Sequence, residues 1–106
     1  MSADLERCFH DAMLSLYEVW RDAAGYRAIR FLQMVRRRGG VEAARRLLGR
    51  KGVSKGFVAL HKAGKLHLTM EAMLVESPEW QTLFSPEELR IARKRLADHG
   101  YQSEDD

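Results

Sequence analysis

The spacing of apolar residues near the start of the chain is the feature that most constrains its fold. From residue 5 to residue 20 they recur at steps of three and four positions: Leu5, Phe9, Ala12, Met13, Leu16, Tyr17 and Trp20. An α-helix turns by about 100° per residue, so this spacing puts all of them on one stripe of a helix. The sequence therefore predicts an amphipathic helix over about residues 3–24, ended by Gly25.

Glycine, serine and proline divide the rest of the chain into further short helices. The predicted segments are about 26–38, 41–48, 55–64, 66–75 and 86–99, with another short helix beginning after Ser77. Gly39 follows the first of these segments, as glycine commonly follows a helix, and Ser54 is placed to cap the third. Ser77 and Ser85 each precede a proline and an early glutamate, and Glu88 completes the sequence of a capping box.

No strand is predicted, because the alternation around residues 66–70 is short and lies against helical sequence. We therefore predict an all-α fold, a compact orthogonal bundle of about five to six short helices in a single domain over residues 1–101. The acidic residues 102–106 are expected to form a disordered tail. The predicted core consists of Phe9, Met13, Tyr17, Trp20, Phe31, Leu32, Val35, Leu47, Leu48, Phe57, Leu60, Met70, Leu74, Leu83, Phe84, Leu89 and Leu96.

The composition fits one globular domain, with 106 residues of which 45% are apolar and 31% are charged. Cys8 is the only cysteine, so no disulfide can form within the chain, as suits a reducing cytosol. The acidic start lacks the basic and apolar parts of a signal peptide, and no apolar run approaches the roughly 20 residues of a membrane span. We expect a soluble cytoplasmic protein without a membrane partner.

The net charge of +3 conceals a strong segregation of charge along the chain. Residues 1–20 carry a net charge of −3, residues 21–65 carry +11, and residues 66–106 carry −5. Solubility is served equally well by mixed signs, so folding alone does not require this arrangement. Its physical consequence is a field that attracts polyanions to the middle of the chain.

Arginines on the predicted second helix are the sharpest functional feature. Arg27, Arg30 and Arg37 gather on one side of that helix, opposite the apolar residues. Arginine suits phosphate because its planar fork donates two hydrogen bonds to one anionic group. The predicted nucleic-acid-binding residues are Arg27, Arg30, Arg36, Arg37, Arg38, Arg45, Arg46, Arg50, Lys51 and Lys55. The competing interpretation is a solvated face, partly paired with acidic segments of the same molecule.

Two short motifs near the middle of the chain offer alternatives. Residues 43–54 resemble the Ala…Leu-Gly…Val-Ser rhythm of a helix-turn-helix, with a turn lengthened by three inserted residues and Gly56 inside the recognition helix. Residues 49–52 fit the Gly-x-x-Gly loop of KH domains, although the sheet of that domain is not predicted. Both motifs are short and are also satisfied by an ordinary helix-to-helix turn.

Catalysis and metal binding are not predicted. His67 and Glu71 would share a face of a continuous helix, but no third or fourth ligand follows at the spacing of a zinc site. The chain contains no Ser-His-Asp or Cys-His arrangement, phosphate-binding loop or dinucleotide glycine pattern. We therefore expect a binding module without cofactors, and a small hydrolase using His67 and Glu71 is kept as an alternative to be excluded.

Short segments between residues 25 and 96 carry a resemblance to one family. They are Gly25-Tyr26, Arg30 to Met34, Gly39 to Ala44, Leu47-Leu48, Gly56-Phe57, Leu60, Gly64 to Leu66, Leu68 to Ala72, Trp80, Leu83-Phe84, Glu87 to Leu89 and Ala92-Arg93. Together they resemble a small all-helical domain of uncharacterised bacterial proteins, found alone or appended to larger proteins, some of them linked to restriction or phage defence. The resemblance implies a bacterial accessory module and assigns no activity or site, and residues 36–55 are more basic here than in that domain.

Two hypotheses of function follow from the sequence. The first is an accessory module that contacts DNA or RNA mainly through phosphates, alone or as a small subunit of a bacterial nucleoprotein or phage-defence assembly. The second is a docking or adaptor module whose basic face meets an acidic protein partner.

Overall fold

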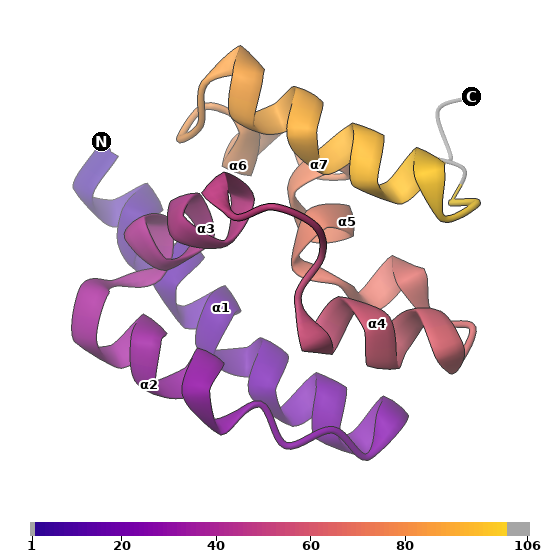
Figure 1. The fold of residues 1–106 in the computed structure, drawn as a ribbon. Coiled ribbons are helices and arrows are strands. Elements are labelled where there is room, and N and C mark those ends of the chain that lie inside the picture. The colour runs from indigo at the N-terminus through magenta and orange to yellow at the C-terminus, as the bar shows by residue number, and fades with distance from the viewer. Residues whose placement is uncertain (1, 102–106) are drawn as a thin grey trace.

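Residues 2–101 are described by a computed structural model, and the helical prediction is confirmed within them (Figure 1). The elements are α1 (Ser2–Ala24), α2 (Ile29–Arg38), α3 (Gly40–Gly49), α4 (Lys55–Lys62), a 3-10 turn η1 (Leu66–Leu68), α5 (Met70–Val75), α6 (Pro78–Gln81) and α7 (Pro86–Asp98). No strand occurs in this part of the chain. The predicted acidic tail, residues 102–106, lies outside the described residues.

The long helix α1 forms one side of the bundle because its apolar stripe meets three other helices. It packs against α2, α3 and α4, and α7 crosses the opposite side over α5 and α3 (Figure 1). Phe9, Met13, Leu16 and Trp20 of the stripe are buried, whereas Tyr17 is only half-buried. The helical period in the sequence therefore identified the face that builds the core.

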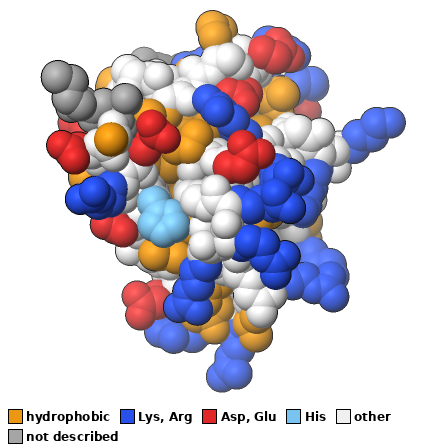
Figure 2. Space-filling model, turned by 90° about the vertical axis from the view of Figure 1, so that its left-hand side faces the viewer, with side chains coloured by type: hydrophobic (Ala, Val, Ile, Leu, Met, Phe, Trp, Pro, Cys, Tyr) orange, Lys and Arg blue, Asp and Glu red, His pale blue; other side chains and the backbone are white. Residues whose placement is uncertain are grey.

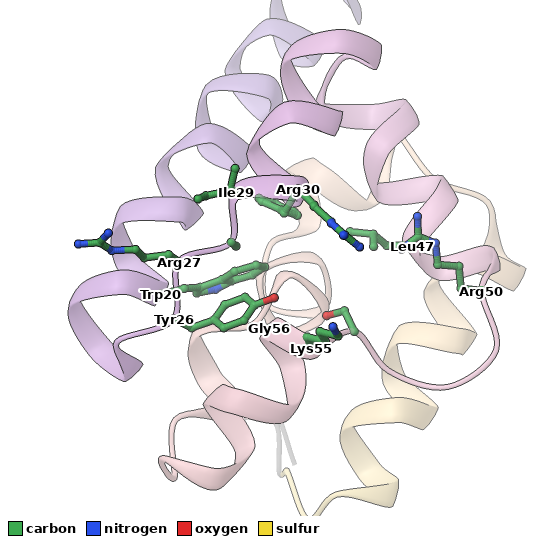
Figure 3. A pocket seen from close by; sticks show the side chains of 12 residues that line it. Trp20, Tyr26, Arg27, Ile29, Arg30, Leu47, Arg50, Lys55 and Gly56 are labelled. Carbon is green, nitrogen blue, oxygen red and sulfur yellow. The ribbon is translucent and has the colours of Figure 1, made fainter.

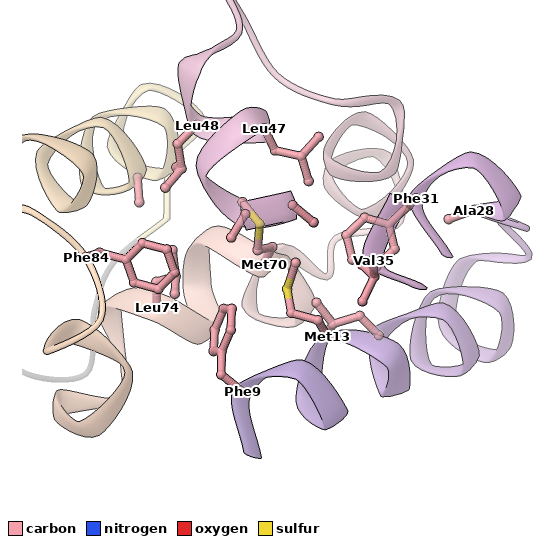
Figure 4. Close-up of a cluster of buried hydrophobic side chains, with 14 of the residues drawn as sticks. Phe9, Met13, Ala28, Phe31, Val35, Leu47, Leu48, Met70, Leu74 and Phe84 are labelled. Carbon is pink, nitrogen blue, oxygen red and sulfur yellow. The ribbon is translucent and has the colours of Figure 1, made fainter. Parts of the chain in front are cut away.

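Aromatic and sulfur-containing side chains fill the centre of the bundle (Figure 4). The ring of Phe9 meets the edges of Phe84 and Trp80, each with ring centroids 5.3 Å apart. Met13 of α1 and Met70 of α5 both belong to this buried cluster. Of the predicted core, Leu32 and Leu83 are only half-buried, and a smaller cluster of Phe57, Ala72 and Leu96 lies apart from the main one.

Serine caps fix the starts of two helices as predicted. The Ser54 hydroxyl accepts a hydrogen bond from the Phe57 amide at 3.1 Å, which starts α4. Ser85 forms a complete capping box with Glu88, in which each side chain accepts from the other residue's amide. Ser77 precedes α6 but makes no such bond, and α6 is a single turn with Pro78 at its start.

Two predicted helices differ from those observed. The segment 66–75 divides at Thr69, whose hydroxyl accepts from the Ala72 amide at 3.1 Å and starts α5 as a separate helix after η1. The helix predicted from residue 26 begins only at Ile29, because Gly25 has φ +65° and the chain remains non-helical through Ala28. With the single turn α6, the described residues form seven α-helices where about five to six were expected.

A buried ion pair ties three elements together. Arg95 of α7 donates to the carboxylate of Glu71 in α5 at 3.1 Å, and also to the backbone carbonyls of Leu48 and Arg50 at 3.1 and 2.7 Å. Glu71 is 3% exposed and Arg95 is 8% exposed. Burial raises the pKa of Glu71, and the nearby Arg95 guanidinium opposes that rise. The pair therefore holds the end of α3 and the start of the α3–α4 connection against α7.

Candidate nucleic-acid interface

An open groove of about 620 Å³ lies where α1 ends, α2 begins and the α3–α4 connection passes (Figure 3). We call it the basic groove; its lining consists of Trp20, Tyr26, Arg27, Ala28, Ile29, Arg30, Phe31, Leu47, Arg50, Ser54, Lys55 and Gly56. Four of these residues are cations and none is an acid. The groove therefore combines an apolar wall with an uncompensated positive charge.

The side chains of three of the four cations lie along the basic groove, and the fourth points away from it. Arg30 extends from α2 towards Leu47, with Arg50 on the opposite side and Lys55 at the start of α4 (Figure 3). The guanidinium of Arg27 points away from the groove in the same view. Because Arg95 binds the Arg50 carbonyl, the backbone that carries the Arg50 side chain is fixed while the side chain itself is exposed.

The floor of the basic groove depends on a close contact between an aromatic ring and a glycine. A Cβ atom at Gly56 would lie 2.8 Å from the Trp20 ring, so only glycine lets α4 approach that ring. The Trp20 ring also packs in a tilted arrangement against Phe31, with ring centroids 4.7 Å apart, and its indole N–H donates to the Leu68 carbonyl at 2.9 Å. The glycine that weakened the helix-turn-helix interpretation is thus the residue against which Trp20 packs.

The remaining predicted cations lie elsewhere on the molecule. Arg36 faces a second hollow between α1 and α2 with Glu18, while Arg38 and Arg45 line a third with Glu6 and Glu42. Arg37, Arg46 and Lys51 are exposed and line none of these three. The ten predicted residues therefore do not converge on one site, although all ten are exposed.

Pairing with the protein's own acids is limited to two of the ten. Arg45 lies 3.5 Å from Glu88 and donates to the Leu83 carbonyl, and Arg46 lies 3.4 Å from Glu42. The side chains of the other eight make no ion pair or hydrogen bond with any residue between 2 and 101. Lys and Arg side chains gather over the right and lower parts of one face of the molecule (Figure 2).

The alternative sites do not assemble in the described part of the chain. His67 is exposed on η1 whereas Glu71 is buried against Arg95, because the continuous helix that would align them is broken at Thr69. Within residues 2–101 no three His, Cys, Asp or Glu side chains are grouped to hold a metal ion. The Gly49–Gly52 loop is present without the sheet of a KH domain, and none of the described helices has the length and apolar character needed to cross a bilayer.

Sequence reasoning missed Trp20, Tyr26 and Gly56 as parts of the site. The available signal was Gly56, because glycine inside a helix costs about 1 kcal/mol and so indicates a packing reason. Comparison with protein-family models, curated proteins and solved structures finds no match for this chain. The likeness between residues 25–96 and the bacterial helical domain stays a prediction, and the functional argument rests on the geometry of the molecule itself.

Proposed function

We propose that this protein binds DNA or RNA through the phosphate backbone, with the basic groove as the centre of the contact. The observation that carries the proposal is the pairing pattern: eight exposed Lys and Arg side chains between residues 27 and 55 have no acidic partner among residues 2–101. Exposed cations without an internal ion pair keep their charge for an external polyanion, and the concentration of eight of them in one part of the chain strengthens the field that attracts it.

The chemistry of the contact follows from the side chains. Arg30 and Arg50 can each donate two parallel hydrogen bonds to a phosphate, and Lys55 adds a compact point charge. Each neutralised phosphate releases counterions, so the logarithm of affinity falls with the logarithm of salt concentration by about 0.9 per duplex contact. Sequence preference is expected to be small, because contacts to phosphate carry no base information.

The test is a salt series with fluorescently labelled duplex and single-stranded oligonucleotides. The variant Arg30→Glu/Arg50→Glu should reduce the salt slope by about two and weaken binding by roughly tenfold or more at low salt. The matched control is Lys62→Glu/Arg93→Glu, which changes formal charge equally at two exposed cations without ion pairs in the described chain and outside the groove. Absence of binding at low salt, or an equal loss in the control, would contradict the proposal.

An acidic protein partner is the second candidate, and Ile29 is the observation that favours it. This side chain is 52% exposed at the rim of the groove, and protein interfaces commonly combine a buried apolar anchor with charged surroundings. Polyglutamate added to the same binding assay separates the two candidates. Displacement of the labelled oligonucleotide by polyglutamate at equal charge concentration would favour the protein partner.

A further inference from the structure

We infer that the basic groove admits a single unpaired base of a nucleic-acid strand, with Arg30, Arg50 and Lys55 on the neighbouring phosphates. This inference rests on the proposed function and adds the kind of strand that the site selects. A strand whose bases are free would fill the groove, whereas a duplex keeps its bases stacked inside and offers the same cations only its phosphates.

The size and the lining of the groove suit an apolar guest with charge at its edges. Its volume of about 620 Å³ lies within the range of about 300–1,000 Å³ that small-molecule sites occupy. Tyr26 is half-buried and Ile29 is 52% exposed, so both present apolar surface to whatever enters. Burying this surface under a base gains hydrophobic and stacking energy that a bare phosphate chain cannot supply.

Polar groups in the groove match a nucleotide better than an acidic peptide. The Tyr26 hydroxyl points towards Gly56 and Lys55 (Figure 3) and has no hydrogen-bond partner among residues 2–101. It can therefore donate to or accept from the edge of a base. An aromatic ring beside arginines is the combination that single-strand binding proteins use for stacking and phosphate contact, whereas a glutamate side chain has no face to stack.

The groove contains its own spectroscopic reporter. Trp20 forms the floor, and Trp80, the second of the two tryptophans, packs against Phe9 and does not line the groove. The variant Trp80→Phe therefore leaves Trp20 as the sole tryptophan, and its emission should change when a base enters. In this background a strand carrying 5-bromouracil should quench Trp20 more strongly than the unbrominated strand.

The deciding experiment compares oligothymidylate with an abasic strand of the same length and with a duplex. The base-carrying strand should bind about 5- to 150-fold more tightly than the abasic strand, the range expected for stacking of one base. Ile29→Ser should remove most of this difference, and Tyr26→Leu, which keeps apolar volume but loses the ring, should reduce it. The matched control is Val58→Ser, at the other large apolar residue exposed in the described chain, which does not line the groove.

The outcomes separate this inference from the proposed function. If no strand binds at low salt, both fail. If the abasic strand, the duplex and oligothymidylate bind equally, or if Ile29→Ser and Val58→Ser behave alike, phosphate binding stands and the base site is overturned. If polyglutamate changes Trp20 emission and outcompetes oligothymidylate, the groove is a docking site for acidic protein and the inference is overturned.

Discussion

Helices α2 and α7 each carry four Lys or Arg residues, and they differ in whether these cations pair with acidic residues of the same molecule. The cations are Arg30, Arg36, Arg37 and Arg38 in α2, and Arg90, Arg93, Lys94 and Arg95 in α7. In α7 three of the four pair with Glu87, Asp98 and Glu71. In α2 none has an acidic partner within residues 2–101.

The difference arises from where the acids lie. Helix α7 carries its own glutamates in the first turn and an aspartate one turn after Lys94, whereas α2 contains no acidic residue. The cations of α7 therefore stabilise the helix and the fold, and those of α2 are left for solvent or a partner. Net charge already separates residues 21–65 from residues 66–106. The spacing of acids within α7 accounts for the pairs of Arg90 and Lys94, whereas the pair of Arg95 with Glu71 of α5 depends on the fold.

The variant with the largest expected effect on the free energy of unfolding is Arg95→Met. The variant leaves Glu71 buried without its cation and leaves the carbonyls of Leu48 and Arg50 without their donor. We expect a loss of about 3–5 kcal/mol in the free energy of unfolding, measured by urea denaturation at pH 7.5. The double variant Glu71→Met/Arg95→Met should be less destabilised than Arg95→Met, because no charge remains buried. A loss below about 1 kcal/mol for Arg95→Met would contradict a structural role for the Arg95–Glu71 pair.

The second test is the pH dependence of that loss. Burial raises the pKa of Glu71 above the ordinary value of 4.5, so the stability linked to its neutral form is present below that value and is lost as pH rises through the folded-state pKa. Removing Arg95 raises the pKa of Glu71 further. The cost of Arg95→Met should therefore shrink as pH falls towards 4.5, by about 1.4 kcal/mol for each unit of that additional rise. A cost independent of pH would show that the carboxylate is not the buried group responsible.

Local rules predicted most of the fold. The caps at Ser54 and Ser85 and the glycine ends at Gly25 and Gly39 depend on a few neighbouring residues, so they can be identified from the sequence. Thr69 was missed because a threonine among Leu and Met residues fits a continuous helix, whereas in the fold its backbone is extended and its hydroxyl bonds to both Leu66 and Ala72, which separates η1 from α5.

The site was harder to predict because it depends on contacts distant in the sequence. Glu71 lies in the first turn of α5, but its partner Arg95 lies 24 residues away in α7. Helical periodicity gives the face of each helix and not the packing of one helix on another. For the same reason it grouped Arg30 with Arg37, whereas in the fold Arg30 and Arg50 both line the basic groove and Arg37 does not.

A third test concerns how the two helices begin. Ser85→Ala removes the capping box of α7 and should lower the free energy of unfolding by about 1 kcal/mol. The matched control is Ser77→Ala, since Ser77 makes no capping bond and its loss should change stability by less than about 0.5 kcal/mol. Helix α2 begins at Ile29, and its N-cap residue Ala28 makes no side-chain hydrogen bond, so α7 alone of these two helices has this contribution to lose. Equal stability losses in the two serine variants would contradict a stabilising contribution of the capping box to α7.

The smallest expected effect on stability belongs to the α2 cations, and it tests most directly whether they differ in role from those of α7. Arg30→Ala/Arg37→Ala removes two exposed α2 cations that make no bond within residues 2–101, so the free energy of unfolding should change by less than about 0.5 kcal/mol. Thermal and urea denaturation measure this change, and oligonucleotide binding is measured on the same samples. If the cations serve a partner, affinity should fall while stability stays constant, the reverse of what Arg95→Met predicts for the fold. A stability loss comparable to that of Arg95→Met would show that the α2 cations stabilise the fold, as Arg95 does, and would contradict the proposal that they serve a partner.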